Sequence, residues 1–305
     1  MIQSSKMVGI GIVGLPNSGK STLFNALLKR QVAQVAEYPY TTIEPNIGVV
    51  EVPDKRLLLI ADCLSITKIV PAAIQFIDIA GLIKGASQGE GLGNQFLGHI
   101  REVDAILHVV RAFDPSTRFA RSGQAIPHVM GDVNPVRDIE VVNLELELAG
   151  IKKPTVYVLN VSENDLKKDF DLPFPYIKIC AKLEAELSEL PEVEQKAYLK
   201  ELGIAESSLN QVILASYKLL NLITFFTVAG GVQVQAWPVK TGTKMIEAAQ
   251  IVHTDFAQNF IKAEIIPWDK LVEAGSWQGA KEKGLLKIAG RDEEVADGDV
   301  IEFKI

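Results

Sequence analysis

Apolar residues follow a repeating pattern along the first two thirds of the chain. Short, almost wholly apolar runs alternate with longer stretches in which apolar residues recur at helical spacing. The runs predict buried strands, and the stretches between them predict helices that pack on a sheet. Strands that alternate with helices are typical of an open, mostly parallel α/β sheet. The predicted strands are residues 8–13, 47–52, 73–79, 105–111, 155–159 and 176–179.

The pattern changes near Leu222. Strands predicted at 223–228 and 232–237 follow one another without a helix between them, and a helical stretch and a final strand at 300–305 complete the chain. This order is typical of a small α+β domain. A chain of 305 residues is also long enough for two domains. We therefore expect one domain over residues 1–221 and a second over residues 222–305.

The first predicted strand leads into Gly14 to Ser21, a segment with the spacing G-x-x-x-x-G-K-S. A helical stretch follows at once, which is the context of a phosphate-binding P-loop. Glycines let backbone N–H groups surround a polyphosphate, a lysine reaches the terminal oxygens, and a hydroxyl binds magnesium. Gly14, Gly19, Lys20 and Ser21 are predicted to fill these roles. Asn17, Ser18 and Thr22 are also expected at the nucleotide.

Two further motifs lie where a nucleotide switch holds its metal and its γ-phosphate. Thr42, chosen over Thr41, lies in a polar segment interrupted by prolines, where a threonine can bind magnesium while the γ-phosphate is present. Asp78 ends a buried strand in the motif D-x-x-G. In P-loop proteins such an aspartate lies near the magnesium ion, and the N–H of the glycine, here Gly81, can sense the γ-phosphate.

The strand at 155–159 ends in Asn160-Val161-Ser162-Glu163. A guanine site has N-K-x-D at this position, and its carboxylate accepts hydrogen bonds from guanine. Here valine replaces the lysine and glutamate replaces the aspartate. Because adenine has an unprotonated nitrogen at the same edge, a carboxylate facing it would repel it, and a displaced carboxylate suits adenine better. The motif favours ATP and leaves GTP as the alternative.

The residue after Gly81 is Leu82, where many GTPases have a glutamine that orients the attacking water. Leucine neither donates nor accepts a hydrogen bond, so hydrolysis needs another group or is slow. Asn17 could help to bind a monovalent cation against the phosphates. His128, in an irregular segment, is a second candidate as the group that orients water.

Composition excludes several classes of protein. A net charge of −7 provides no overall basic surface for non-specific DNA binding. No apolar run is long enough to span a membrane, and the first residues lack the pattern of a signal peptide. Cys63 and Cys180 form no C-x-x-C motif, so we expect reduced cysteines without zinc in a cytoplasmic protein.

Four of these segments together resemble the Obg-like ATPase (YchF) family: GLPNSGKSTLFNALL, YPYTTIEPNIGVV, DIAGLIKGASQGEGLGNQFL and NVSE. The C-terminal QAWPVKTGTKMIEAAQIVHTDF and DGDVIEF look like the family's TGS domain, a β-grasp module. The resemblance implies that the chain binds ATP and magnesium and is able to bind potassium. It also implies a monomer that associates with the large subunit of the ribosome. The nucleotide residues that it implies are Asn17, Gly19, Lys20, Ser21, Thr22, Thr42, Asp78, Gly81, Asn160 and Glu163.

The chain departs from the family pattern between Ala149 and Thr155. The family inserts a long helical coiled coil there, whereas in this sequence Gly150 to Lys153, followed by Pro154, lead directly to the strand. Either the arm has been deleted or its residues are missing from the sequence. Three functions remain open at this point: an ATP-hydrolysing switch, a GTPase of the same fold, and a binding module that holds a nucleotide without productive hydrolysis.

Overall fold

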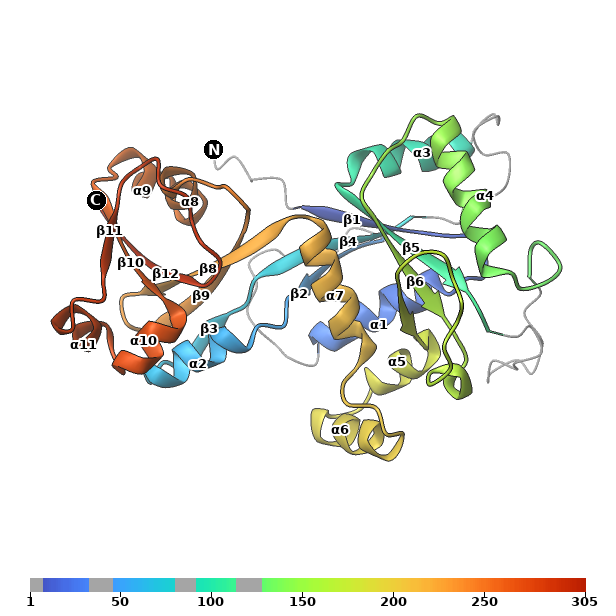
Figure 1. The fold of residues 1–305 in the computed structure, drawn as a ribbon, viewed down its shortest axis with the longest axis horizontal. Coiled ribbons are helices and arrows are strands. Elements are labelled where there is room, and N and C mark those ends of the chain that lie inside the picture. Colours follow the sequence, from blue (N-terminus) through green and yellow to red (C-terminus); the bar gives the residue numbers. More distant parts are fainter. Residues whose placement is uncertain (1–7, 33–45, 80–91, 114–127) are drawn as a thin grey trace. The chain divides into compact units, whose positions relative to one another are not determined.

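The structure is a computed structural model and describes residues 8–32, 46–79, 92–113 and 128–305. Their contacts divide them into two units (Figure 1). Residues 8–50 and 74–219 form the first, here called the P-loop unit. Residues 51–73 and 220–305 form the second, here called the C-terminal unit.

The P-loop unit contains a sheet with the strand order β2-β4-β1-β5-β6-β7. The pairs β1/β4, β1/β5, β5/β6 and β6/β7 are parallel. The two central strands, β1 and β5, are buried along their whole length, as their largely apolar sequences predict, although β5 also buries His108 and Arg111. The predicted parallel α/β sheet is confirmed. Its strands are β1 (Gly9–Val13), β2 (Ile47–Glu51), β4 (Ala73–Asp78), β5 (Ala105–Arg111), β6 (Thr155–Asn160) and β7 (Tyr176–Ile179).

Helices cover both faces of this sheet. Side chains of α3 and α4 join those of β1 and β5 in one core cluster, while α7 contacts β5, β6 and β7, and α1 packs against α5. Residues 181–201 form two helices, because Pro191 cannot continue the first helix and instead precedes the second. The helices are α1 (Lys20–Val32), α3 (Leu92–Glu102), α4 (Pro135–Leu148), α5 (Ala181–Leu187), α6 (Glu192–Glu201) and α7 (Ser208–Leu219), with the 3₁₀ turn η1 (Glu163–Asp165).

The connection from α4 to β6 is a short turn. Gly150 has a φ of +68°, and the N–H of Ile151 donates to the carbonyl of Leu146 at 2.9 Å. This is the arrangement in which a left-handed residue closes the end of a helix. Ile151 is then buried in the core shared by α3 and α4. The chain thus passes from helix to strand at the point where the family pattern has its coiled coil.

The C-terminal unit contains a mixed sheet with the order β11-β10-β12-β8-β9-β3. Its core lies between the sheet and α8, with aromatic contacts among Phe225, Trp237 and Phe303. The predicted α+β class is confirmed. The elements after residue 220 are β8 (Leu222–Ala229), β9 (Gln233–Lys240), α8 (Met245–Val252), α9 (Thr254–Gln258), β10 (Lys262–Pro267), α10 (Trp268–Ala274), α11 (Trp277–Glu282), β11 (Lys287–Ala289) and β12 (Asp299–Lys304).

Residues 51–73 leave the first sheet after β2 and return to it at β4. Between these strands they form α2 (Lys55–Cys63) and β3 (Lys68–Val70), and β3 pairs in parallel with β9 at the edge of the second sheet. Arg56 in α2 binds Asp54 and Asp297 and lies over the ring of Phe226. The expectation of two consecutive domains, 1–221 and 222–305, does not include this association of residues 51–73 with the C-terminal residues. None of the described helices combines the length and the apolar character needed to cross a membrane.

Candidate nucleotide site

The turn between β1 and α1 has a backbone that only glycine can supply at two positions. Gly14 has a φ of +152°, and a Cβ there would lie 2.2 Å from the carbonyl oxygen of Val109. Gly19 has a φ of +99°, and its Cβ would lie 2.2 Å from Nδ2 of Asn160. Asn17 also has a positive φ, of +62°. The loop is therefore held in a strained, close-packed conformation of the kind that surrounds phosphates with backbone N–H groups.

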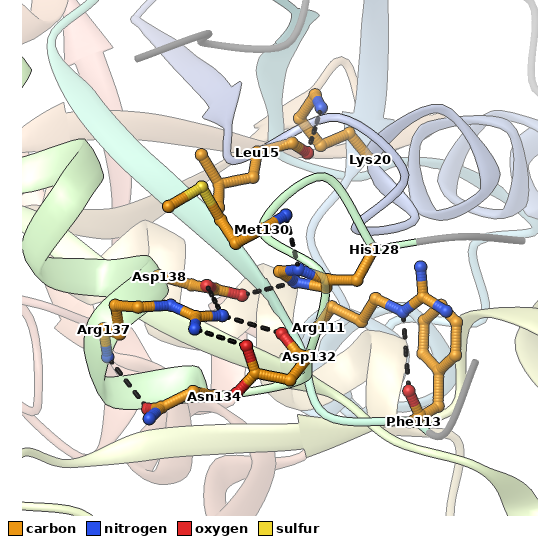
Figure 2. A network of polar contacts seen from close by, with 10 residues as sticks. All are labelled: Leu15, Lys20, Arg111, Phe113, His128, Met130, Asp132, Asn134, Arg137 and Asp138. Atoms are coloured by element: carbon orange, nitrogen blue, oxygen red, sulfur yellow. Dashed lines mark hydrogen bonds and ion pairs between the residues drawn. The ribbon is translucent and has the colours of Figure 1, made fainter.

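Lys20 begins α1 and is 7% exposed. Its ammonium group donates to the carbonyl oxygen of Leu15 at 3.0 Å, across the loop (Figure 2). Burial lowers the pKa of Lys20 to about 8, and the negative charge of Asp78 opposes part of this effect. The buried ammonium has a neutral carbonyl as its hydrogen-bond acceptor, so no directly bonded anion in the described part of the chain neutralises its charge. A polyphosphate would supply such an anion.

Two polar atoms beside Lys20 are buried without a hydrogen-bond partner among the described residues. They are Oγ of Ser18 and Oδ1 of Asp78. Buried polar atoms are rarely left unsatisfied, so each points to a ligand or water. Asp78 ends β4 beside β1, and Ser21 lies exposed in the first turn of α1. A hydroxyl and a carboxylate are oxygen ligands of the kind that magnesium takes, so this donor set fits the metal.

Asn160 has a structural role at the end of β6. Its Nδ2 donates to the carbonyl oxygen of Ser18 at 2.8 Å, and its Oδ1 accepts from the N–H of Ala181 at 3.0 Å. The buried amide thus ties the P-loop to the start of α5. Val161 is buried beside it, whereas Glu163 is exposed in η1.

His128 lies buried before α4, with Asp138 of that helix beside it. Nε2 of His128 is 2.7 Å from Oδ2 of Asp138, and Nδ1 accepts from the N–H of Met130 at 3.1 Å. Figure 2 shows the imidazole between these two partners. Met130 packs against the core cluster to which Leu15 of the P-loop also belongs.

Two more buried polar side chains lie on β5. His108 is enclosed, and burial together with the nearby charge of Lys20 lowers its pKa to about 3. It is therefore neutral at physiological pH, and its Nδ1 is buried without a hydrogen-bond partner among the described residues. Arg111 at the end of β5 lies over the ring of Phe113, with its guanidinium carbon 4.3 Å from the ring centroid, and pairs with Asn160 in the sheet register.

The structure brings together part of the predicted site. Gly19 touches Asn160, and Lys20 lies within the electrostatic reach of Asp78. Thr22 is exposed at the start of α1, on the same turn as Ser21. The predicted contacts of Thr42, Gly81 and Leu82 lie outside the described residues.

The partner of His128 could not be predicted from the sequence. Asp138 lies ten positions further along the chain and belongs to no recognisable motif with it. A carboxylate in the first turn of a helix usually serves the helix N-terminus, and nothing in the sequence distinguishes it from that common case. The acceptor of the Lys20 ammonium is a backbone carbonyl, which leaves no sequence signal at all.

Known proteins match both parts of the chain. A family model described as a 50S ribosome-binding GTPase matches residues 9–161, and the model YchF-GTPase_C, described as a protein of unknown function, matches residues 222–305. The solved structure of the Schizosaccharomyces pombe YchF GTPase is 30% identical, with a TM-score of 0.81, and the match covers 97% of each chain.

Curated relatives match the chain over nearly its whole length. The ribosome-binding ATPase YchF of Bacillus subtilis is 41% identical, with 96% of this chain and 98% of the relative covered. That of Mycoplasma genitalium is 39% identical, with 98% and 99% covered. The Bacillus alignment spans 368 positions, more than the 305 residues here, so the relative contains residues without a counterpart in this chain. At this identity and coverage, the chain belongs to the YchF family.

Proposed function

We propose that this chain binds and hydrolyses ATP with magnesium and acts as a nucleotide-dependent switch on the ribosome. The observation that carries the proposal is Lys20, an ammonium buried in a glycine-shaped loop with a carbonyl oxygen as its acceptor. The names of the curated relatives, ribosome-binding ATPase, support the activity and the partner.

The phosphates are held by the P-loop. The N–H groups at the start of α1 and the ammonium of Lys20 bind their oxygens, and the hydroxyl of Ser18 has an unused hydrogen-bonding capacity in the same loop. Ser21 and Asp78, with Thr42, would hold the magnesium ion. When bound, that ion neutralises charge on the β- and γ-phosphates. Asn17, with its positive φ, is the residue we assign to a potassium ion.

The base is expected to be adenine. The amide of Asn160 is engaged with Ser18 and Ala181, and Val161 is buried, so this side of the site lacks the lysine stem that covers guanine in N-K-x-D proteins. Glu163 is exposed in η1, in a position where its carboxylate can turn away from the base. These features support ATP over GTP.

The nucleotide preference is tested by binding. Affinities of the purified chain for ATP and GTP are measured by calorimetry with magnesium, and Lys20→Ala is the control that should abolish binding. A clear preference for GTP would contradict the adenine assignment. Unchanged binding by the Lys20 variant would contradict the assignment of the phosphate site.

Hydrolysis is assigned to His128 as the group that orients the attacking water, because its segment shares a core cluster with Leu15 of the P-loop and Leu82 cannot make the required hydrogen bond. His128→Ala should therefore lower the turnover number with little effect on ATP affinity. Wild-type turnover by this variant would remove His128 from the mechanism. If phosphate release is undetectable with and without potassium, the chain is a nucleotide-holding module instead of an ATPase.

The ribosomal partner is assigned to the large subunit, with the chain acting as a cytoplasmic monomer. Co-sedimentation with purified large and small subunits tests this assignment. The chain should pellet with large subunits to an extent that differs between ATP and ADP. Equal retention with both nucleotides would argue against a switch.

A further inference from the structure

The pair of His128 and Asp138 is the most deeply buried contact between titratable side chains near the P-loop, among the described residues. The exposed fractions of the two side chains are 1% and 3%. A carboxylate this far from water is costly unless it is fully bonded. Asp138 meets this requirement through Nε2 of His128 at 2.7 Å on one oxygen and Nη2 of Arg137 at 3.4 Å on the other.

The geometry determines which nitrogen of the imidazole carries the proton. The N–H of Met130 can only donate, so Nδ1 of His128 must be the acceptor. A neutral imidazole with Nδ1 as acceptor has its proton on Nε2, and that N–H points at the carboxylate of Asp138. A partner on one ring nitrogen in this way selects the tautomer and fixes the ring.

The carboxylate itself is held in place from several sides. Asp138 lies in the first turn of α4, where Asn134 caps the helix by accepting from the N–H of Arg137 at 3.1 Å. Negative charge is favoured at this end of a helix. The guanidinium of Arg137 is in turn held by Asp132, through the side chain at 2.6 Å and the backbone carbonyl at 2.7 Å (Figure 2).

From this arrangement we infer that Asp138 is the positioning residue for His128. It keeps the proton on Nε2, so that Nδ1 is the atom that accepts a hydrogen bond from the attacking water. In the present structure the N–H of Met130 occupies that acceptor, and the water takes its place during hydrolysis. The inference rests on the proposed role of His128. A merely structural pair would hold the same tautomer, so kcat and the double variant separate the two roles.

The first test is made with magnesium and a non-hydrolysable ATP analogue, so that water can replace the N–H of Met130 at Nδ1 and Asp138 alone selects the tautomer. Long-range ¹H–¹⁵N spectra of the whole chain, assigned with His128→Ala, report which ring nitrogen is protonated. The wild type should show the Nε2–H tautomer alone. Asp138→Asn, which keeps the shape of the side chain but offers an amide that can donate or accept, should give a mixture of tautomers. An unchanged tautomer in this variant would overturn the inference.

The second test is steady-state ATP hydrolysis. Asp138→Asn should lower kcat by about 10-fold or more and leave KM within about twofold. It should have no further effect in the His128→Ala background, because both changes remove the same function. Glu145→Gln is the matched control, since it removes a carboxylate that is also buried on α4 while both ring nitrogens of His128 keep their partners.

The outcomes separate this inference from the proposed role of His128. If His128→Ala has wild-type turnover, the proposed role fails. If His128→Ala is slow but Asp138→Asn is not, or if the two effects multiply, that role stands and the positioning inference is wrong. Should Asp138→Asn fold poorly, Arg137→Gln is the alternative variant, because it removes the hydrogen bond from Arg137 to the carboxylate of Asp138. It should lower kcat by a smaller factor and leave KM unchanged. An unchanged kcat in a folded Arg137→Gln variant would contradict the inference.

Discussion

Replacing Lys20 by methionine should stabilise the nucleotide-free chain while it abolishes nucleotide binding. Burial lowers the pKa of Lys20 from 10.5 to about 8. This difference corresponds to roughly 3 kcal/mol of unfavourable free energy for keeping the ammonium charged at neutral pH. Methionine removes that cost and also removes the hydrogen bond to Leu15, which is worth about 1 kcal/mol. The expected net gain is about 2 kcal/mol.

The pH dependence has a definite sign. The pKa of Lys20 is lower in the folded chain than in the unfolded chain, so the unfolded chain binds the extra proton between about pH 8 and pH 10.5. The unfavourable free energy is therefore fully present below pH 8 and disappears as the pH rises through this range. The advantage of Lys20→Met over the wild type should shrink over the same range.

Urea unfolding at several pH values, with and without magnesium and ATP, measures both effects. At an ATP concentration of about 100 times Kd the wild type should gain about 2.7 kcal/mol, and the variant should gain nothing. Lys29→Met is the control, because Lys29 lies on the same helix but is half-exposed and pairs only at the surface with Glu189. A variant that is less stable than the wild type at pH 7, or a difference that does not change with pH, would refute the reasoning.

Three further predictions concern separate parts of the fold. His108 has a pKa of about 3 when folded, so stability should fall as the pH drops below 6.5; between pH 7 and pH 5 the wild type should lose about 2 kcal/mol more than His108→Leu in urea unfolding. Gly19→Ala should lower the free energy of unfolding by about 2–4 kcal/mol and weaken ATP binding, because the new Cβ displaces Asn160. Gly98→Ala is the control: it has open space around its Cβ and should raise the free energy of unfolding by about 1 kcal/mol. Equal effects of the two substitutions would contradict this account. Arg56→Met removes the ion pairs with Asp54 and Asp297, so it should lower the stability of the C-terminal unit by about 1–3 kcal/mol in thermal unfolding. ATP affinity should not change. A loss of affinity would show that the role of Arg56 is not confined to that unit.

The sequence predicts those features that local patterns encode. The strands of the P-loop unit are apolar runs because both faces of a central parallel strand are buried, and β1 and β5 show this most clearly. The glycines of the loop are recognisable because their spacing follows from the shape of a phosphate. Gly14 and Gly19 have the backbone conformations that this spacing requires.

Features that depend on contacts between distant residues were not predictable in the same way. Strand β3 has three residues, one of them an exposed lysine, and its partner β9 lies more than 160 positions further along the chain. Such a short strand gains its stability from pairing and not from its own sequence. The partner of His128 and the structural bonds of Asn160 likewise depend on tertiary packing, which residue spacing does not report.

The insertion of residues 51–73 into the second sheet means that the two units are joined covalently at three points instead of one. The chain leaves β2 for the C-terminal unit, returns from it to β4, and crosses again after α7. Thr42 precedes β2, and Gly81 follows β4, so both segments predicted to sense the γ-phosphate are attached to the ends of this insertion. A displacement of either segment can therefore be transmitted through the backbone itself. The C-terminal residues are, for the same reason, not a module that a cut at residue 221 would release intact, because such a fragment would lack both α2 and an edge strand.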